Sequence, residues 1–185
     1  MYMAFALSFG ALILIGSAHH AFFRRYGPTD KGTIALNAVL LFVVLFYVYP
    51  LKYLTLTFVT GVLGFRSGPG SEHLIRNLDE LGLLFAIYGV GFVAVFACFA
   101  LLHLHVARHA LALGLEVVER FDAISSAGMY SIMASVGVLS VTLSLTGIGV
   151  RYGLPGIAYS IIGPLAWWHG RARQRTRGAL TASTA

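Results

Sequence analysis

Residues 81–106 read LGLLFAIYGVGFVAVFACFALLHLHV, an uninterrupted run of 26 residues without a single Asp, Glu, Lys or Arg. A helix needs about 20 predominantly apolar residues to cross the hydrocarbon core of a bilayer, which is roughly 30 Å thick. The run is therefore long enough for one crossing. It lacks the alternation of apolar and polar residues that a barrel strand requires, so it predicts a transmembrane helix.

The composition of the whole chain also indicates that the protein lies in a lipid bilayer. Apolar residue types account for 58% of the 185 residues, charged types for only 11%, and the mean hydropathy is +0.81. A soluble domain carries about 25% charged residues, so this composition excludes a cytosolic enzyme, a nucleic-acid-binding domain and a disordered tail. Cys98 is the single cysteine, which excludes a disulfide framework and a cysteine-based zinc site. The chain is therefore an integral membrane protein whose main partner is the lipid bilayer.

Four further apolar runs accompany the first one. They cover Met3–Ala18, Ile34–Val62, Ala127–Val150 and Leu154–Trp168. We predict an all-α integral membrane protein, a bundle of about five transmembrane helices. The connections are short, so residues 1–178 are expected to form a single transmembrane domain and residues 179–185 a flexible C-terminal tail. A short interfacial helix is predicted at Ser71–Glu80.

The distribution of Lys and Arg orients these helices, because cytoplasmic connections carry an excess of both residues. Four of them fall on one side and nine on the other. The C-terminus is therefore expected in the cytoplasm and, with five crossings, the N-terminus outside, in a multi-pass protein of the cell membrane. Trp167-Trp168 before an Arg-rich segment is typical of an interfacial anchor and not of nucleic-acid binding. The nine basic residues are Arg24, Arg25, Lys31, Arg108, Arg120, Arg171, Arg173, Arg175 and Arg177.

The acidic residues all fall in connections or at the ends of the predicted helices. A proton-coupled transporter usually keeps a carboxylate inside the membrane, because a buried charge is costly and is retained for function. Their placement weighs against a proton-driven transporter and against acid–base catalysis in the bilayer. We expect neither an enzyme nor a bound cofactor. The seven residues are Asp30, Glu72, Asp79, Glu80, Glu116, Glu119 and Asp122.

Two short patterns look like ion or metal sites. Tyr88-Gly-Val-Gly-Phe92 superficially matches a potassium-selectivity filter, but such a filter is an extended loop. Inside an apolar run, helix packing through small residues is the expected use. His105 and His109, near His103, could share a metal because they lie four residues apart on a helix. Since no carboxylate or Cys is close in sequence, we expect no metal, and a membrane enzyme built on these histidines ranks last.

A polar stripe follows the run at Ala127–Val150. Ser131, Ser135, Thr142 and Thr146 fall within about 60° of one another at 100° per residue. Hydroxyls on one face either let two helices pack closely or line a water-filled path. Both interpretations stay open, and this stripe is the best pore candidate that the residues alone indicate.

A second polar group joins the first two runs. His19 and His20 lie at the end of the first run, and Asn37 lies at the start of the second. A short turn between the runs makes these ends neighbours. The sequence is consistent with a His–Asn hydrogen bond that ties the two helices together, and equally with a histidine pair at the membrane interface.

Several of these residues carry a family resemblance. In order, the chain contains Ser8-Phe9, His19-His20-Ala-Phe22-Phe23, Asp30, Leu36-Asn37, Leu40-Leu41 and Pro50. This order and spacing resemble the second and third helices of the prokaryotic relatives of the lysosomal potassium channel, transmembrane protein 175. The resemblance covers residues 4–58 well and the later helices by their apolar layout.

The resemblance implies a function and an assembly. It implies passive potassium conduction by a homo-oligomer, a tetramer in the bacterial members. In that family a first helix with an Arg-x-x-x-Phe-Ser-Asp signature lines the pore, and this chain begins at what resembles the second helix. Conduction would then use the face from Ser131 to Thr146, or a partner that supplies the pore helix. The alternatives are a non-conducting scaffold or accessory subunit, and a reading frame that starts at an internal Met.

Overall fold

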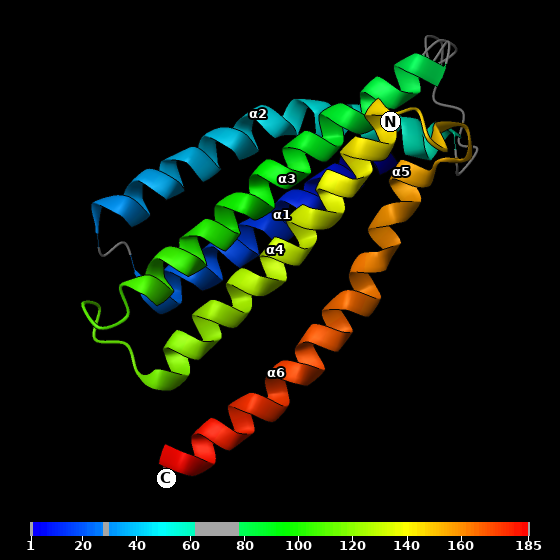
Figure 1. Cartoon of the computed structure of the whole chain (residues 1–185). Helices are drawn as coiled ribbons and strands as arrows, with labels where there is room; N and C mark the ends of the chain where they lie inside the picture. The colour runs from blue at the N-terminus through cyan, green and yellow to red at the C-terminus, as the bar shows by residue number, and fades with distance from the viewer. Residues whose placement is uncertain (1, 28–29, 62–77, 185) are drawn as a thin grey trace.

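The structure, a computed structural model, describes residues 2–27, 30–61 and 78–184, and every regular element in these ranges is helical. Four long helices come first, and a broken helical arm follows them (Figure 1). The long helices are α1 (Tyr2–Tyr26), α2 (Lys31–Gly61), α3 (Leu78–Arg108) and α4 (Val117–Leu145). The arm consists of η1 (Val150–Tyr152), α5 (Leu154–Ile157), η2 (Ala158–Ile161) and α6 (Ile162–Thr184).

Within these ranges, four helices are long and apolar enough to cross a membrane. The qualifying segments are Phe5–Tyr26, Lys31–Val48, Asp79–Arg108 and Val117–Leu145. At 1.5 Å per residue, even the 18 residues of the second segment extend about 27 Å, close to the thickness of the hydrocarbon core. The all-α membrane architecture predicted from sequence is therefore confirmed.

The fifth predicted crossing, Leu154–Trp168, is helical, but it is not one regular α-helix and is not among the four qualifying segments. The structure divides it among α5, η2 and the start of α6. Pro155 and Pro164 lack the backbone N–H that a helix interior uses, and Gly153 before α5 has a φ of +69°. The predicted run Ala127–Val150 also shifts, because α4 begins at Val117 and ends at Leu145.

The structure tests two other expectations only in part. Most of the interfacial helix predicted at Ser71–Glu80 lies outside the described residues, and its last three positions belong to the first turn of α3. Helix α6 continues through Thr184, while the single domain and the flexible tail over 179–185 stay predictions.

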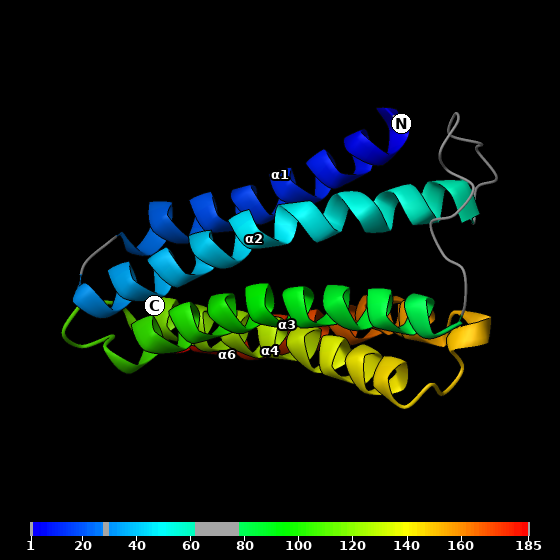
Figure 2. The same cartoon turned by 90° about the horizontal axis from the view of Figure 1, so that it is seen from above.

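The helices form two layers. Figure 2 shows α1 and α2 side by side, with α3, α4 and α6 in a second layer beneath them. Burial is greatest along α3, which packs against α2 of the other layer and against α4 of its own layer. The side chains in this core that are no more than 2% exposed are Phe22, Leu40, Val95, Phe99, Leu102, Val106 and Ala123.

Glycines allow α3 to approach both of its neighbours closely. A methyl group at Gly91 would overlap the ring of Tyr47 on α2, and one at Gly89 would overlap Val141 on α4. In the opposite direction, a Cβ at Gly137 of α4 would lie 2.7 Å from a methyl of Val93. The helix is continuous through Tyr88–Phe92, which confirms packing through small residues as the role of this segment.

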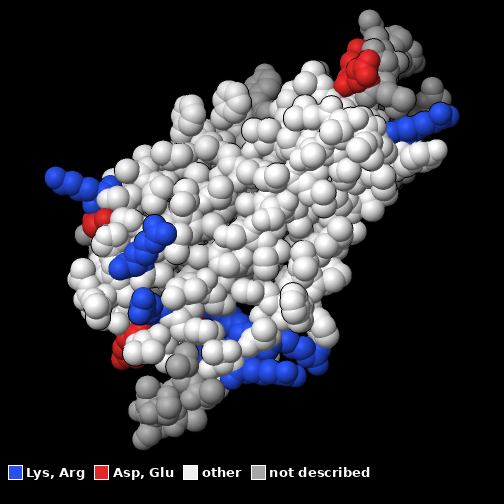
Figure 3. All heavy atoms as spheres, viewed as in Figure 1, with Lys and Arg blue, Asp and Glu red and all other residues white. Residues whose placement is uncertain are grey.

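Charged groups gather at the two ends of the bundle. On the face in Figure 3, a broad band without Lys, Arg, Asp or Glu separates the two charged ends. The end of α1, the start of α2, the end of α3 and the start of α4 meet at one end, toward which α6 also runs (Figure 1). These elements carry the nine basic residues that the charge count assigned to one side. The band has the character of a lipid-facing belt.

The glycine contacts lead to a test. Replacing Gly91 with Ala forces a methyl group against Tyr47, and overpacking of this kind costs about 1–3 kcal/mol. We expect a lower melting temperature in detergent. Gly10→Ala is the matched control, because no atom lies within 4 Å of a Cβ built there. Equal melting temperatures for the two variants would contradict the close α2–α3 approach.

Candidate functional site

The predicted stripe on α4 lies on an outward face of the helix. Ser131, Ser135, Thr142 and Thr146 are all exposed. Each hydroxyl donates to the backbone carbonyl four residues earlier, at 2.8 to 2.9 Å. Since the O–H is used inside the helix, the oxygen lone pairs remain directed outward. The stripe is therefore a row of hydrogen-bond acceptors that extends about 22 Å from Ser131 to Thr146.

The opposite face of α4 carries a second hydroxyl row that the sequence interpretation missed. Ser140 is fully buried and donates to the carbonyl of Pro155 at 2.8 Å. Ser144 is also buried and donates to the carbonyl of Ser140 at 2.8 Å. This row attaches α5 to α4. It therefore serves helix packing, whereas the exposed stripe remains available to another partner.

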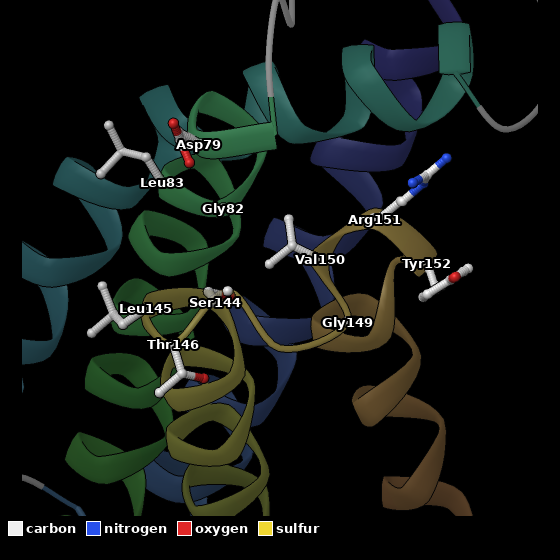
Figure 4. Close-up of a pocket in the computed structure, with 11 residues that line it drawn as sticks. Asp79, Gly82, Leu83, Ser144, Leu145, Thr146, Gly149, Val150, Arg151 and Tyr152 are labelled. Atoms are coloured by element: carbon white, nitrogen blue, oxygen red, sulfur yellow. The ribbon is translucent and has the colours of Figure 1, made fainter.

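Two hollows lie along the exposed stripe. Ser131 and Ser135 line a groove of about 390 Å³ whose other wall includes Ile161 and Leu165. Thr146 lies in a larger pocket of about 740 Å³ at the end of α4. That pocket lies between the start of α3, which contributes Asp79, and the loop with Arg151 (Figure 4). The stripe thus runs from a groove beside α6 to a polar pocket at the end of the bundle away from the nine basic residues.

Of the three polar residues predicted to meet at the α1–α2 connection, the structure brings two together, His19 and Asn37. The ring Nε2–H of His19 donates to Asn37 Oδ1 at 2.6 Å, and the His19 ring also packs on Phe23 with centroids 4.8 Å apart. His20 is exposed on a different face of α1, and the described residues give it no hydrogen-bond partner. The pair has the geometry of a link between two helices, and its role as a packing network stays a prediction.

Asp30, just before α2, is one of the residues that carry the family resemblance, but the sequence interpretation gave it no role in a site. Its carboxylate accepts hydrogen bonds from the Thr33 hydroxyl and from His105 Nε2–H, the latter at 2.8 Å. The bond from Thr33, followed by that from His105, holds the pKa of Asp30 far below its usual range. This carboxylate therefore joins the start of α2 to the end of α3. His103 of α3 donates to the carbonyl of Phe99, and His109, directly after α3, donates to the carbonyl of His105.

A cluster that we name the Asp122 clamp lies near the start of α4. It consists of Asp122, only 1% exposed, and three arginines that contact its carboxylate. Arg25 of α1 donates at 2.6 Å, Arg173 of α6 donates at 2.7 Å, and Arg177 of α6 lies at 3.3 Å. One turn along α4, the carbonyl of Ser125 accepts from His169 at 2.9 Å. The clamp joins three helices through one buried charge.

Sequence separation explains why the clamp was missed. Asp122 lies 97 residues from Arg25 and 51 from Arg173. The charge count had already assigned both arginines to one side of the membrane, which was the signal available. It could not identify the carboxylate that they share, because helix packing decides which of the basic residues meet.

The clamp predicts that a conservative substitution at Asp122 lowers the stability of the protein. Asp122→Asn keeps the shape of the side chain but leaves three guanidiniums without their shared carboxylate. Hydrogen bonds to a charged group contribute about 1.5–3 kcal/mol each, and water offsets part of the loss because the guanidiniums left behind are 28–53% exposed. We therefore expect a clear drop in melting temperature in detergent. Asp79→Asn is the control, because Asp79 is exposed at the other end of the bundle. A melting temperature as high as that of the control variant would rule out a stabilising clamp.

Comparison with known proteins assigns this architecture to a family. No family model matches the chain. Over 145 residues it is 38% identical to a protein of Marivirga tractuosa described as a potassium channel, a match that covers 76% of this chain and spans 58% of that relative's length.

A solved structure matches more fully. It is the potassium channel MtTMEM175, crystallised as a variant with a nanobody fusion protein. This chain is 34% identical to it with a TM-score of 0.80, and the match covers 94% of this chain and 77% of that one. The helices, their order and the sequence identity agree with the resemblance drawn from the first two helices. The chain is therefore a multi-pass membrane protein that belongs to the family of prokaryotic channels related to transmembrane protein 175.

Proposed function

We propose that the chain is a subunit of a potassium channel that conducts passively across the cell membrane. The observation that carries this proposal is the 34% identity with a potassium channel over 94% of the chain. The second relative is also described as a potassium channel. Both are transport proteins and not enzymes, which agrees with the expectation from sequence.

The placement of carboxylates supports passive conduction. Among the described residues, acidic side chains occur before α2, at the N-cap of α4, and within the first two turns of α3 and α4. Proton-coupled transporters commonly use carboxylates at membrane depth, and the central turns of the described helices have none. Potassium would therefore move down its own electrochemical gradient.

The stripe on α4 is our candidate for a pore-lining face within this chain. Potassium channels replace the hydration shell of the ion with oxygen ligands. The hydroxyl oxygens of Ser131, Ser135, Thr142 and Thr146 point their lone pairs away from the helix, as such ligands must. A homotetramer, the assembly that the family resemblance implies, would bring four copies of this face around one axis.

The same hydroxyl geometry favours a second candidate function. Ser and Thr bonded to their own helix are also common where two membrane helices pack. The stripe would then contact a partner, either as the surface of a non-conducting accessory subunit or beside a pore helix that the partner supplies.

Flux measurements with cysteine variants test the conducting role. The purified chain in liposomes should release potassium. In a Cys98→Ala background, Thr142→Cys should become sensitive to a cationic thiol reagent. A fixed positive charge 4 Å from the ion costs about 1 kcal/mol in water and about 4 kcal/mol near a protein surface, so flux should fall about tenfold or more.

Ser17→Cys in the same background is the matched control, because Ser17 is an exposed serine on α1 that also bonds to its own helix. Its modification should leave flux unchanged. A folded oligomer that releases no more potassium than empty liposomes would contradict conduction by the chain alone and favour the accessory role.

We also propose that the basic end of the bundle faces the cytoplasm, which leaves the N-terminus outside. The support is the concentration of nine Lys and Arg residues on the elements at that end, together with the positive-inside rule.

A C-terminal fusion to green fluorescent protein, which matures in the cytoplasm, tests this orientation. We expect fluorescent cells, and an alkaline phosphatase fusion at the same position should be inactive. An active phosphatase fusion with dark cells would reverse the orientation.

A further inference from the structure

The Asp122 clamp carries more positive charge than its carboxylate neutralises. Three guanidiniums contact this one carboxylate. Glu119 also acts on Arg25. It keeps its negative charge while it accepts the backbone N–H of Glu116 at 3.1 Å, and it therefore offsets only part of the positive charge. Guanidiniums gathered this closely repel one another, so an additional anion would stabilise the cluster.

The clamp also remains open to its surroundings. Asp122 is 1% exposed, whereas the side chains of Arg25 and Arg177 are 39% and 53% exposed. The carboxylate is thus at the bottom of the cluster and the guanidiniums form its outer surface. Figure 3 shows Lys and Arg side chains gathered at this end of the molecule. An anion could therefore reach the guanidiniums without any rearrangement of the helices.

The position of the clamp along α6 matches the headgroup layer of a membrane. Trp167 and Trp168 are 63% and 70% exposed, and exposed tryptophans favour the boundary between hydrocarbon and headgroups. The guanidinium of Arg171 already stacks over Trp167 at 4.3 Å. Arg173 follows Trp168 by five residues, or about 7.5 Å of helix. The headgroup layer is about 5–8 Å thick on each side, so Arg173 falls inside it.

We propose that the Asp122 clamp binds the phosphate of an anionic lipid headgroup. A guanidinium presents a planar pair of N–H donors that fits two phosphate oxygens. The lipid as the source follows from position, because a phosphate in the adjacent headgroup layer is already concentrated at the depth of the arginines. The bound phosphate would contact arginines from both α1 and α6, and so would strengthen the joint between these helices and α4.

Native mass spectrometry of the full chain in detergent, with phosphatidic acid added, tests this proposal. Phosphatidylcholine and inorganic phosphate, each at the same concentration, form the comparison arms. We expect bound phosphatidic acid in clear excess over phosphatidylcholine, and no comparable binding of inorganic phosphate. Because each Arg near an anionic surface contributes about 1 kcal/mol, Arg173→Gln with Arg177→Gln should weaken binding roughly tenfold to thirtyfold.

Arg108→Gln with Arg151→Gln is the matched control, since it removes the same charge away from Asp122. Its affinity for phosphatidic acid should remain close to that of the unaltered chain. If the glutamine pair at positions 173 and 177 fails to fold, Arg173→Lys with Arg177→Lys keeps the charge, loses the planar fork, and should still weaken binding. Equal binding of phosphatidylcholine, equal losses in the control variant, undiminished binding in the lysine variant, or equally strong binding of inorganic phosphate would each overturn the proposal.

Discussion

The close approach of α3 to its neighbours is the contact on which the rest of the bundle depends. Hydrocarbon offers a helix no hydrophobic driving force toward another helix, so association relies on van der Waals contact and hydrogen bonds. Gly89 and Gly137 bring the backbones of α3 and α4 together, and Gly91 admits the ring of Tyr47 from α2. With three helices fixed in this way, the starts of α2 and α4 and the end of α3 meet at one end of the bundle. There Asp30 contacts His105, and Asp122 contacts its arginines.

The sequence predicts the fold correctly where a long apolar segment forms one helix. It does not predict the segment in which the helix is interrupted. Residues 81–106 are apolar throughout, and their helix needs only hydrogen bonds within the segment. The run Leu154–Trp168 has similar composition but includes two prolines and follows Gly153, which has a positive φ. Whether prolines kink, break or merely cap a helix depends on the neighbours that satisfy the freed backbone groups. Here the buried hydroxyl of Ser140 donates to the carbonyl of Pro155 and fixes α5 against α4, a contact that the local sequence does not indicate.

The candidate site also has parts that the sequence predicts and a part that it does not. A stripe such as Ser131–Thr146 follows from helical periodicity alone, since its members lie on one helix. The link between His19 and Asn37 could be anticipated because a short turn makes those helix ends neighbours. The Asp122 clamp combines α1, α4 and α6, and the partners of Asp122 lie 97 and 51 residues away. Local patterns carry no information on such contacts, which follow from how α1, α4 and α6 are placed relative to one another in the bundle.

The attachment of the arm to α4 at two points, one in α5 and one in α6, has a consequence for how such chains can diverge. In α5, the carbonyl of Pro155 accepts from Ser140; in the middle of α6, His169 and Arg173 contact Ser125 and Asp122. Between these points the helix must keep its rotational phase. A single inserted residue would turn the arginines by about 100° and carry them away from α4, whereas seven residues, close to two full turns, would restore their direction. Insertions and deletions that relatives tolerate in this segment should therefore be close to whole helical turns in length. The direction in which the arginines point would then be conserved more strictly than the residues between the two attachment points.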